Sequence, residues 1–184
     1  MERTDLKTQR LLLRPFQFGD VEDVLAYASD SEWGRFLLTF VAPPVYTREH
    51  AETFVAQALL DPWEVHPRFA IQLEQHVIGG VDLSVQAEHK IAGLGYAIGR
   101  SYWGQGLTPE AARAVMDWGF LTFGLVKIFA RADARNRQST RVMEKLGMTR
   151  EGLLRKQRYL RGEHVDEVWY GLVREDWEQG RKAG

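Results

Sequence analysis

A short glycine-containing loop, placed between a strand-like segment and a strong helix start, constrains this chain more than any other feature. The loop contains Gly104 and Gly106, and Thr108-Pro109-Glu110 follows it. Threonine favours a helix N-cap, proline the first helical position and glutamate the positive end of the helix dipole. Glycines allow positive φ, and the unpaired amides of the helix start point into the same small volume. The pattern predicts a site for a phosphate or diphosphate, although a plain tight turn would use the same glycines.

Several other classes of protein are excluded by the residues around this loop and elsewhere. A P-loop requires Lys-Ser or Lys-Thr after its second glycine, whereas Leu107-Thr108 follows Gly106, so hydrolysis of a nucleoside triphosphate is not expected. The glycines within residues 93–99 lack the spacing of a dinucleotide fingerprint, and no helix opens there. The chain has no cysteine, its five histidines show no metal-ligand spacing, and no Gly-x-Ser-x-Gly elbow of a serine hydrolase occurs.

Length and charge favour an ordinary soluble protein. The 184 residues are 45% hydrophobic, enough for a single domain over residues 1–184 with its own core. With 24 Lys+Arg against 25 Asp+Glu, the net charge of −1 gives no overall attraction to nucleic acid or to an anionic membrane. No apolar run reaches the roughly 18 residues that span a bilayer, and the polar first five residues lack a signal-peptide core. We therefore expect a cytoplasmic protein that binds neither nucleic acid nor membrane.

Apolar spacing predicts a mixed sheet with helices on its faces, an α/β (α+β) arrangement. Pro43-Pro44 and residues 61–67 are typical of loops. Asp20 and Thr47 are expected to cap the first two helices, and Thr108 and Ser139 to open the last two. The predicted strands cover residues 10–14, 68–73, 77–85, 91–98, 126–132, 148–158 and 164–173, and the predicted helices cover residues 21–28, 48–60, 108–123 and 139–146.

A second polar segment follows the predicted strand at residues 126–132. Asn136 at the strand exit and Ser139 at the next helix can hydrogen-bond an extended polar ligand, although both residue types also simply cap helices. Together, the two segments resemble the GNAT superfamily of N-acetyltransferases, most closely its RimJ/RimL-like branch, which acetylates N-terminal amines. The segments that carry the resemblance are Trp103-Gly-Gln-Gly-Leu-Thr-Pro-Glu-Ala111, Asn136-x-x-Ser139, Glu144-Lys-Leu-Gly147, Thr8-x-Arg-Leu-x-Leu-Arg14, Glu151-Gly-x-x-Arg155 and Gly162-x-x-x-Asp166.

The resemblance implies a GNAT fold, a mostly antiparallel sheet of about seven strands with a splay between strands 4 and 5, flanked by about four helices. It implies acetyl-CoA as cosubstrate and no metal. The diphosphate would lie on the loop amides, the pantetheine along the strand that ends at Ile98, and an amide near Ile98 would polarise the thioester carbonyl. The cofactor-binding residues implied in this way are Tyr96, Ala97, Ile98, Trp103, Gly104, Gln105, Gly106, Leu107, Thr108, Asn136, Ser139, Arg141 and Lys145.

Ser139 and Asn136 are the catalytic residues that the resemblance implies, but the groups that often move protons in relatives are missing. Gly93 stands where many members have a glutamate, Met143 where many have a tyrosine, and Arg158 where branch members have a glutamate. Three interpretations stay open. A carboxylate acts as base through water, the acceptor needs no strong base, or catalysis is lost. The carboxylates considered are Asp82, Glu88 and Glu151.

The acceptor is predicted to be an amine that is easily deprotonated. An α-amine with pKa ~8 is roughly 10% neutral at pH 7, whereas a lysine near 10.4 is about 0.04% neutral, a difference of about 3.3 kcal/mol. This favours a protein or peptide N-terminus, such as that of a ribosomal protein. An amino acid, polyamine or antibiotic, a catalytically silent acyl-CoA-binding module and a pure interaction protein are the alternatives.

The predicted acceptor pocket uses residues from three parts of the chain. Trp33 and Phe36 follow the first predicted helix and either line this pocket or pack as ordinary aromatics, and Asp82 and Tyr159 complete the predicted substrate-binding set. Residues 131–161 carry eight Arg and two Lys against three acids, either as a solvated surface or to meet the phosphates of CoA or an acidic acceptor. The apolar C-terminal hairpin leaves a homodimer open.

Overall fold

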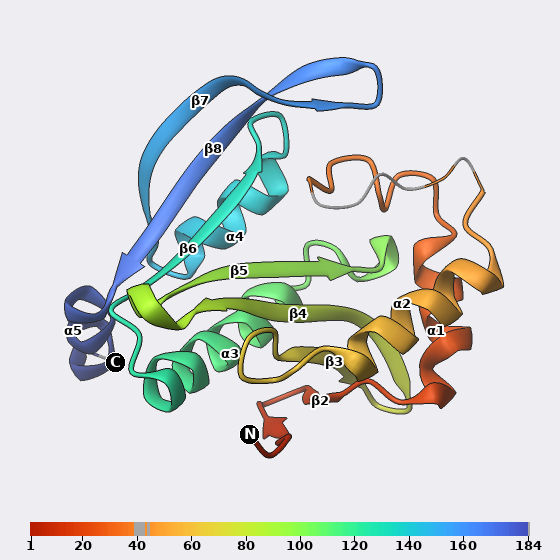
Figure 1. Ribbon diagram of the computed structural model, residues 1–184, viewed down its shortest axis with the longest axis horizontal. Coiled ribbons are helices and arrows are strands. Elements are labelled where there is room, and N and C mark those ends of the chain that lie inside the picture. The colour runs from red at the N-terminus through yellow and green to blue at the C-terminus, as the bar shows by residue number, and fades with distance from the viewer. Residues whose placement is uncertain (39–42, 44, 184) are drawn as a thin grey trace.

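Figure 1 shows the computed structural model of the chain, which describes residues 1–38, 43 and 45–183. Within these residues, eight strands form one sheet in the order β1-β2-β3-β4-β5-β6-β8-β7. Neighbouring strands are antiparallel except β5 and β6, which are parallel. The strands are β1 (Leu6–Lys7), β2 (Leu12–Pro15), β3 (Arg68–Leu73), β4 (His76–Gln86), β5 (Ile91–Ile98), β6 (Lys127–Asp133), β7 (Thr149–Leu160) and β8 (Glu163–Val173). The helices are α1 (Val21–Ala28), α2 (Arg48–Leu60), α3 (Leu107–Phe123), α4 (Arg137–Lys145) and α5 (Arg174–Ala183), with short 3-10 turns at Phe18–Asp20, Ala87–His89 and Arg100–Tyr102.

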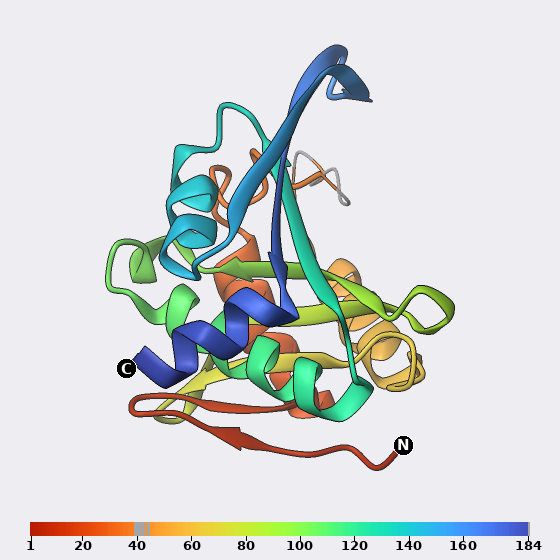
Figure 2. The ribbon, with the colours of Figure 1, turned by 90° about the vertical axis from the view of Figure 1, so that its left-hand side faces the viewer.

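The helices cover the two faces of the sheet. Helices α1 and α2 lie in front of the sheet in Figure 1, and α3 and α5 lie behind it, as the turned view of Figure 2 also shows. Alternation along the strands separates two cores. Ala70 packs with Val55 on the α1/α2 face, whereas Leu83 and Ile128 pack with Phe120 on the α3 face. The sheet therefore has a separate apolar core on each of its two faces.

The sheet splays between β5 and β6. These strands pair only from Ile91 with Lys127 to Gly93 with Phe129, although β5 continues to Ile98. Beyond Gly93, β6 diverges from β5 and continues alongside β8 (Figure 1). This is the splay expected between the fourth and fifth predicted strands, and it leaves the last residues of β5 without a neighbour on that side.

The β7–β8 hairpin projects past the body of the molecule (Figures 1 and 2). Most of β7 is exposed, including Leu153, Leu154 and Tyr159, because β7 is the edge strand of the sheet. Its pairing with β8 shifts register between Leu154 and Arg158. Bulges of this kind bend a strand, which fits the arched shape of the hairpin.

All seven predicted strands and all four predicted helices are present, with bounds that shift by up to two residues. The prediction missed β1, which has only two residues, and α5, whose polar sequence gave little apolar periodicity. Trp177 in α5 nevertheless stacks on Phe120 with ring centroids 4.7 Å apart. Of the predicted Pro43-Pro44 loop, Pro44 lies outside the described residues.

Two predicted helix starts were wrong by one or two residues, and at a third, correctly predicted start the Asp20 side chain makes no capping bond. Gly106, at φ 78°, caps α3, so Thr108 is the second residue of that helix and not its cap. Asn136 caps α4 through a bond from the Ser139 amide, so Ser139 is its third residue. The Asp20 carboxylate pairs with Arg14 at 2.7 Å instead of capping α1. Gly106 takes the cap position of α3 because glycine tolerates its positive φ. At the other two helices the capping role changes because Asn136 accepts the Ser139 amide and Asp20 pairs with Arg14.

Candidate active site

The last residues of β5 offer unpaired backbone groups to the splay. The amide of Gly99 donates to the carbonyl of Ile78 at 2.8 Å. This bond shows which pairs of opposite residues on β4 and β5 are hydrogen-bonded to each other. Bonded and non-bonded pairs alternate in an antiparallel ladder. Ala97 therefore turns its backbone groups toward β4, whereas Tyr96 and Ile98 turn theirs away, toward the splay.

Trp103 occupies the backbone carbonyl of Ile98 and leaves the backbone amide of Ile98 without a partner from this side chain. Its indole nitrogen donates to the carbonyl of Ile98 at 2.9 Å, so this tryptophan fixes the loop against the end of β5. The amide of Ile98 still faces the splay. An N–H group fixed in a half-buried strand end is a suitable donor to a carbonyl oxygen that gains negative charge.

The glycine loop adopts the predicted conformation. Gly104 and Gly106 both have φ 78°, a region that other residues rarely adopt, and α3 begins directly afterwards. The first amides of α3 have no carbonyl one turn earlier and point out of the helix end. One expected donor is already used, because the amide of Trp103 bonds the carbonyl of Arg100 at 3.1 Å. The predicted anion cradle would therefore use the amides of residues 104–108 and not that of Trp103.

The N-terminal segment holds this loop in place. Glu110, in the first turn of α3, accepts hydrogen bonds from the Thr8 hydroxyl at 2.6 Å and from the Arg10 side chain at 2.7 Å. Arg10 also donates to the carbonyl of Gln105 at 3.0 Å. Burial raises the pKa of the Glu110 carboxyl, but the bonds from Thr8 and Arg10 outweigh it and bring this pKa below its ordinary value.

Across the splay, α4 presents Asn136 and Ser139. The Asn136 side-chain oxygen accepts from the Ser139 amide at 3.0 Å, and the Ser139 hydroxyl lies 2.9 Å from that of Tyr96. Burial raises the pKa of Tyr96 to about 12, against a smaller lowering by the Ser139 bond. Tyr96 therefore stays protonated throughout the neutral range and holds the start of α4 against β5.

A cavity of about 380 Å³ lies between β5, the loop and α4. Of the predicted cofactor residues, Gln105 and Leu107 do not line it. The Leu107 side chain is buried in the core, and that of Gln105 bonds the carbonyl of Ser101. The predicted residues that line it are Trp33, Tyr96, Ala97, Ile98, Trp103, Gly104, Gly106, Thr108, Asn136, Ser139, Arg141 and Lys145, and those that the sequence analysis missed are Leu37, Tyr102, Pro109, Gln138 and Val142.

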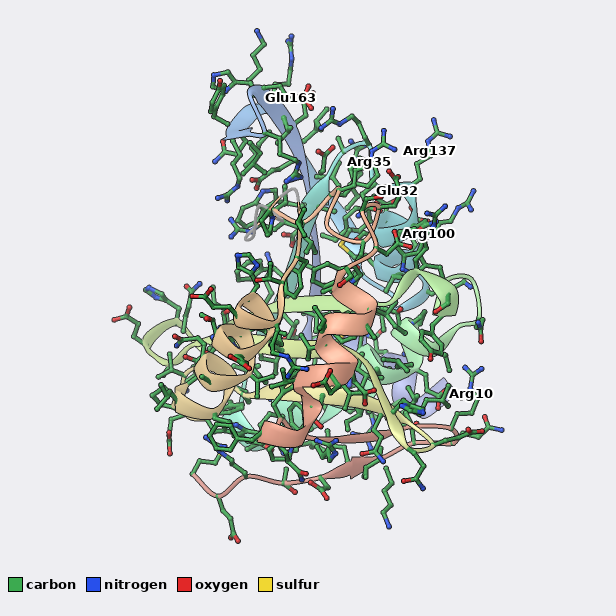
Figure 3. The ribbon with its side chains drawn as sticks, turned by 90° about the vertical axis from the view of Figure 1, so that its right-hand side faces the viewer. Arg10, Glu32, Arg35, Arg100, Arg137 and Glu163 are labelled. Carbon is green, nitrogen blue, oxygen red and sulfur yellow. The ribbon has the colours of Figure 1, made fainter. Side chains whose placement is uncertain are left out.

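A second cavity of about 340 Å³ shares a wall with the first and has a cationic rim. Trp33 and Phe36 line it from the α1–α2 connection, and Arg135 and Arg137 from the segment after β6. Arg137 and Glu32, both labelled in Figure 3, line this cavity together. The buried indole nitrogen of Trp33 has no partner among the described residues. The expected acceptor role of Trp33 and Phe36 is compatible with this position.

The other predicted substrate residues line neither cavity. Tyr159 lies far along β7, is 64% exposed and contacts His164. Asp82 lies on β4, where its carboxylate bonds His66 at 2.9 Å. The sequence analysis gave no role to His66, since a lone histidine in a loop offers no spacing signal.

The structure shows the surroundings of the three positions at which relatives often carry a base or an acid. A side chain at Gly93 would meet the ring of Phe129 at 3.1 Å, so no acidic side chain fits there without a shift. Arg158 pairs with buried Glu167 at 2.7 Å, and Met143 is fully buried. None of these three positions supplies a proton acceptor to the splay.

Comparison with known proteins agrees with this geometry. Residues 10–149 match the family model described as an acetyltransferase (GNAT) domain. The chain belongs to the GNAT acetyltransferase family. It is 32% identical to the uncharacterized N-acetyltransferase YnaD of Bacillus subtilis (strain 168), over 94% of this chain and 98% of that protein. Its structure superimposes on a GNAT-family acetyltransferase from Bacillus anthracis with a TM-score of 0.83 and 30% identity, covering 94% and 99% of the two chains.

A further relative is the spermidine N(1)-acetyltransferase of Escherichia coli (strain K12), 29% identical over 65% of this chain and 67% of that protein. These matches show an N-acetyltransferase with a GNAT fold. In the described part of the chain, no helix is long and apolar enough to cross a membrane, and no cluster of three potential metal ligands occurs.

Proposed function

We propose that this GNAT enzyme moves the acetyl group of acetyl-CoA directly to a primary amine, and that the acceptor is the N-terminal α-amine of a protein or peptide. One observation carries the proposal. The free edge of β5 at Tyr96 and Ile98 opens into the same cavity as the glycine loop and the start of α4. An extended amide-containing chain that ends in a diphosphate fits this combination of a strand edge and an anion cradle.

The cofactor would lie along this path. The amides of residues 104–108 would hold the diphosphate, and pantetheine would pair with β5 as an added strand. Asn136 uses its side-chain oxygen to cap α4, which leaves its amino group for a pantetheine carbonyl. Arg141 and Lys145, one turn apart on α4, line the cavity and would meet the remaining phosphate.

The reaction follows from these positions. The acceptor nitrogen forms a bond to the thioester carbon while the Ile98 amide stabilises the charge on the carbonyl oxygen. The carbon–sulfur bond then breaks, and the sulfur receives a proton through the Ser139 hydroxyl. The ammonium form of the acceptor loses two protons in all, one to the sulfur and one to solvent.

Two features support an α-amine acceptor. None of the three positions where relatives carry a base or acid bears such a group, so an amine that is already partly neutral reacts at lower cost. The rim of the second cavity carries Arg135 and Arg137, with Glu32 as its only acid among the described lining residues. Arg135 is paired with Asp133 and Glu163, so the rim charge available to an acceptor comes from Arg137, which favours a carboxylate over a further amine nearby.

Acetylation of a small amine is the second candidate, since a spermidine acetyltransferase is among the relatives. A screen that detects free thiol from acetyl-CoA separates the two. We expect peptides with a free N-terminus to turn over at least tenfold faster, in kcat/KM, than spermidine or N-terminally blocked peptides that contain lysine. Faster turnover of spermidine or of a lysine side chain would contradict the α-amine assignment.

A further inference from the structure

A carboxylate lies directly beside the open part of β5, although it belongs to the neighbouring strand. Asp82 on β4 is in register with Gly95 on β5, so both face the same side of the sheet. A Cβ at Gly95 would lie 2.7 and 3.0 Å from the two carboxylate oxygens of Asp82. The Asp82 carboxylate thus lies across Gly95, in space that any larger residue would occupy.

This carboxylate faces the side of the sheet from which the acceptor would enter. Tyr96 points to the α3 face, where its hydroxyl meets Ser139. Its neighbour Gly95, and with it Asp82, faces the opposite side, which α1 and α2 cover. The thioester would cross the sheet between these two sides at the splay.

Asp82 forms a hydrogen bond with His66, whose other ring nitrogen lies within ion-pair distance of Asp61. His66 lies between two carboxylates, with its Nε2 2.9 Å from Asp82 and its Nδ1 3.1 Å from Asp61. Asp61 is buried and is held by Arg68 at 2.7 Å and by Gln57 at 2.6 Å. The imidazole of His66 thus lies between the two carboxylates, and its contact with Asp82 fixes the position of that carboxylate on the sheet.

The other two carboxylates considered from the sequence lie at the closed end of the splay. Glu88 precedes β5 and its side chain is 83% exposed. Glu151 pairs with Lys127, the residue of β6 that is in register with the first residue of β5. Of the three, Asp82 alone lies beside the unpaired part of β5.

We propose that Asp82, held by His66 and Asp61, accepts the proton of the acceptor ammonium through one water molecule. This rests on the proposed acetyl transfer. The ammonium gives one proton to the Asp82–His66 pair, and the resulting amine attacks the thioester carbon. The second nitrogen proton goes to the sulfur as the carbon–sulfur bond breaks, and the pair then returns its proton to solvent. His66 and Asp61 are positioning residues in this step.

The charged groups facing the pair are Asp61 at the end of α2 and Arg68 on β3, and Arg68 lies 3.3 Å from the Nδ1 of His66. On β5, the residue opposite Asp82 is Gly95, which carries no charge. These groups stay in place in the variants below, except where one of them is itself changed.

The test is the pH dependence of kcat/KM with an N-terminal peptide as acceptor. Asp82→Asn should lower kcat/KM by about 100-fold at pH 7, the lower end of the range for general base catalysis, because a water intervenes. The loss should shrink above pH 9, where an α-amine is neutral without help. The affinity for CoA, measured by titration calorimetry, should change less than twofold.

Two further variants act without altering Asp82. Gly95→Ala adds a methyl group where the carboxylate lies, so it should reproduce the pH-dependent loss and leave CoA affinity intact. His66→Gln should cause a smaller loss, and its combination with Asp82→Asn should cost no more than Asp82→Asn alone. Asp176→Asn, the same chemical change on exposed α5, is the matched control and should match the wild type.

Some results would overturn the inference. An equal loss at every pH, wild-type rates for Asp82→Asn or Gly95→Ala, or the same pH-dependent loss in Glu88→Gln or Glu151→Gln would do so. Wild-type protein that releases no thiol with any amine would refute the proposed function instead, and the inference with it, so the two failures are distinguishable.

Discussion

Single residues at this site serve structure and chemistry together. Asn136 caps α4 and lines the cavity, and Ser139 supplies the capped amide and a hydroxyl next to Tyr96. A polar side chain at a helix start is already held in one orientation by its cap. The capping and ligand-binding interpretations of Asn136-x-x-Ser139 are therefore not alternatives.

Ser139→Ala tests the chemical half of this dual role. The backbone amide and the cap remain, so we expect CoA affinity within twofold of the wild type and a kcat at least tenfold lower, measured by thiol release. Tyr96→Phe removes only the partner hydroxyl and should cost about 1 kcal/mol of unfolding free energy with a smaller loss in kcat. Because the pKa of Tyr96 is about 12, no step in the pH–kcat profile below pH 10 should depend on this tyrosine. Full activity in Ser139→Ala would remove it from the proton path.

At the level of residues, sequence reasoning found the parts with a local signal. Gly104 and Gly106 were predictable because positive φ selects glycine, and Arg141 and Lys145 because helical spacing places them on one face. His66 was not predictable, since its partners Asp61 and Asp82 come from a different helix and strand. Tyr159 lines neither cavity, and its predicted substrate role stays a prediction, because the sequence does not reveal where the hairpin places this side chain.

Elements depend on each other around the glycine loop. The N-terminal segment bonds the start of α3 through Thr8 and Arg10, which both donate to Glu110, and Arg10 also donates to the carbonyl of Gln105. This explains why a threonine and an arginine about a hundred residues before the loop belong to the recognisable pattern. They fix the direction of the amides that the cofactor would meet.

The Glu110 contacts predict a pH-dependent contribution to stability. A carboxyl with a lowered pKa stabilises the fold above its ordinary value of 4.5, and the contribution is lost as pH falls below it. The unfolding free energy of the wild type should exceed that of Glu110→Gln by on the order of 1 kcal/mol at pH 7, because Arg10 is partly exposed. The difference should shrink between pH 4.5 and 3. Denaturant unfolding at several pH values measures it, and a gap that does not depend on pH would contradict this role.

The order of elements was predictable because buried strands and amphipathic helices leave strong periodic signals. The two elements that were not predicted, β1 and α5, depend on contacts that form only in the folded protein. β1 pairs through two residues, Leu6 and Lys7, too few for a pattern. The sequence of α5 is mostly charged, and Trp177 is its one residue with a large buried contact.

Over the whole molecule, the proposed reaction gives different tasks to the two sides of the sheet, which meet at the splay. The α3 face carries the glycine loop, Ser139 and the cationic residues of α4, which suit a phosphate-bearing cofactor. The α1/α2 face carries Asp82 and the loop of Trp33 and Phe36, which suit an amine acceptor. The proposed direct transfer across the opening needs no residue to carry the acetyl group.

The most direct measurement is a calorimetric titration of CoA into the wild type and two glycine variants. Gly106→Ala and Gly124→Ala each place a side chain at positive φ, at opposite ends of α3, and should lose similar stability, about 1–2 kcal/mol. We predict one CoA site in the wild type, about tenfold weaker binding in Gly106→Ala and unchanged binding in Gly124→Ala. No binding by the wild type, or equal affinities in the two variants, would contradict a CoA site built from the amides at the start of α3.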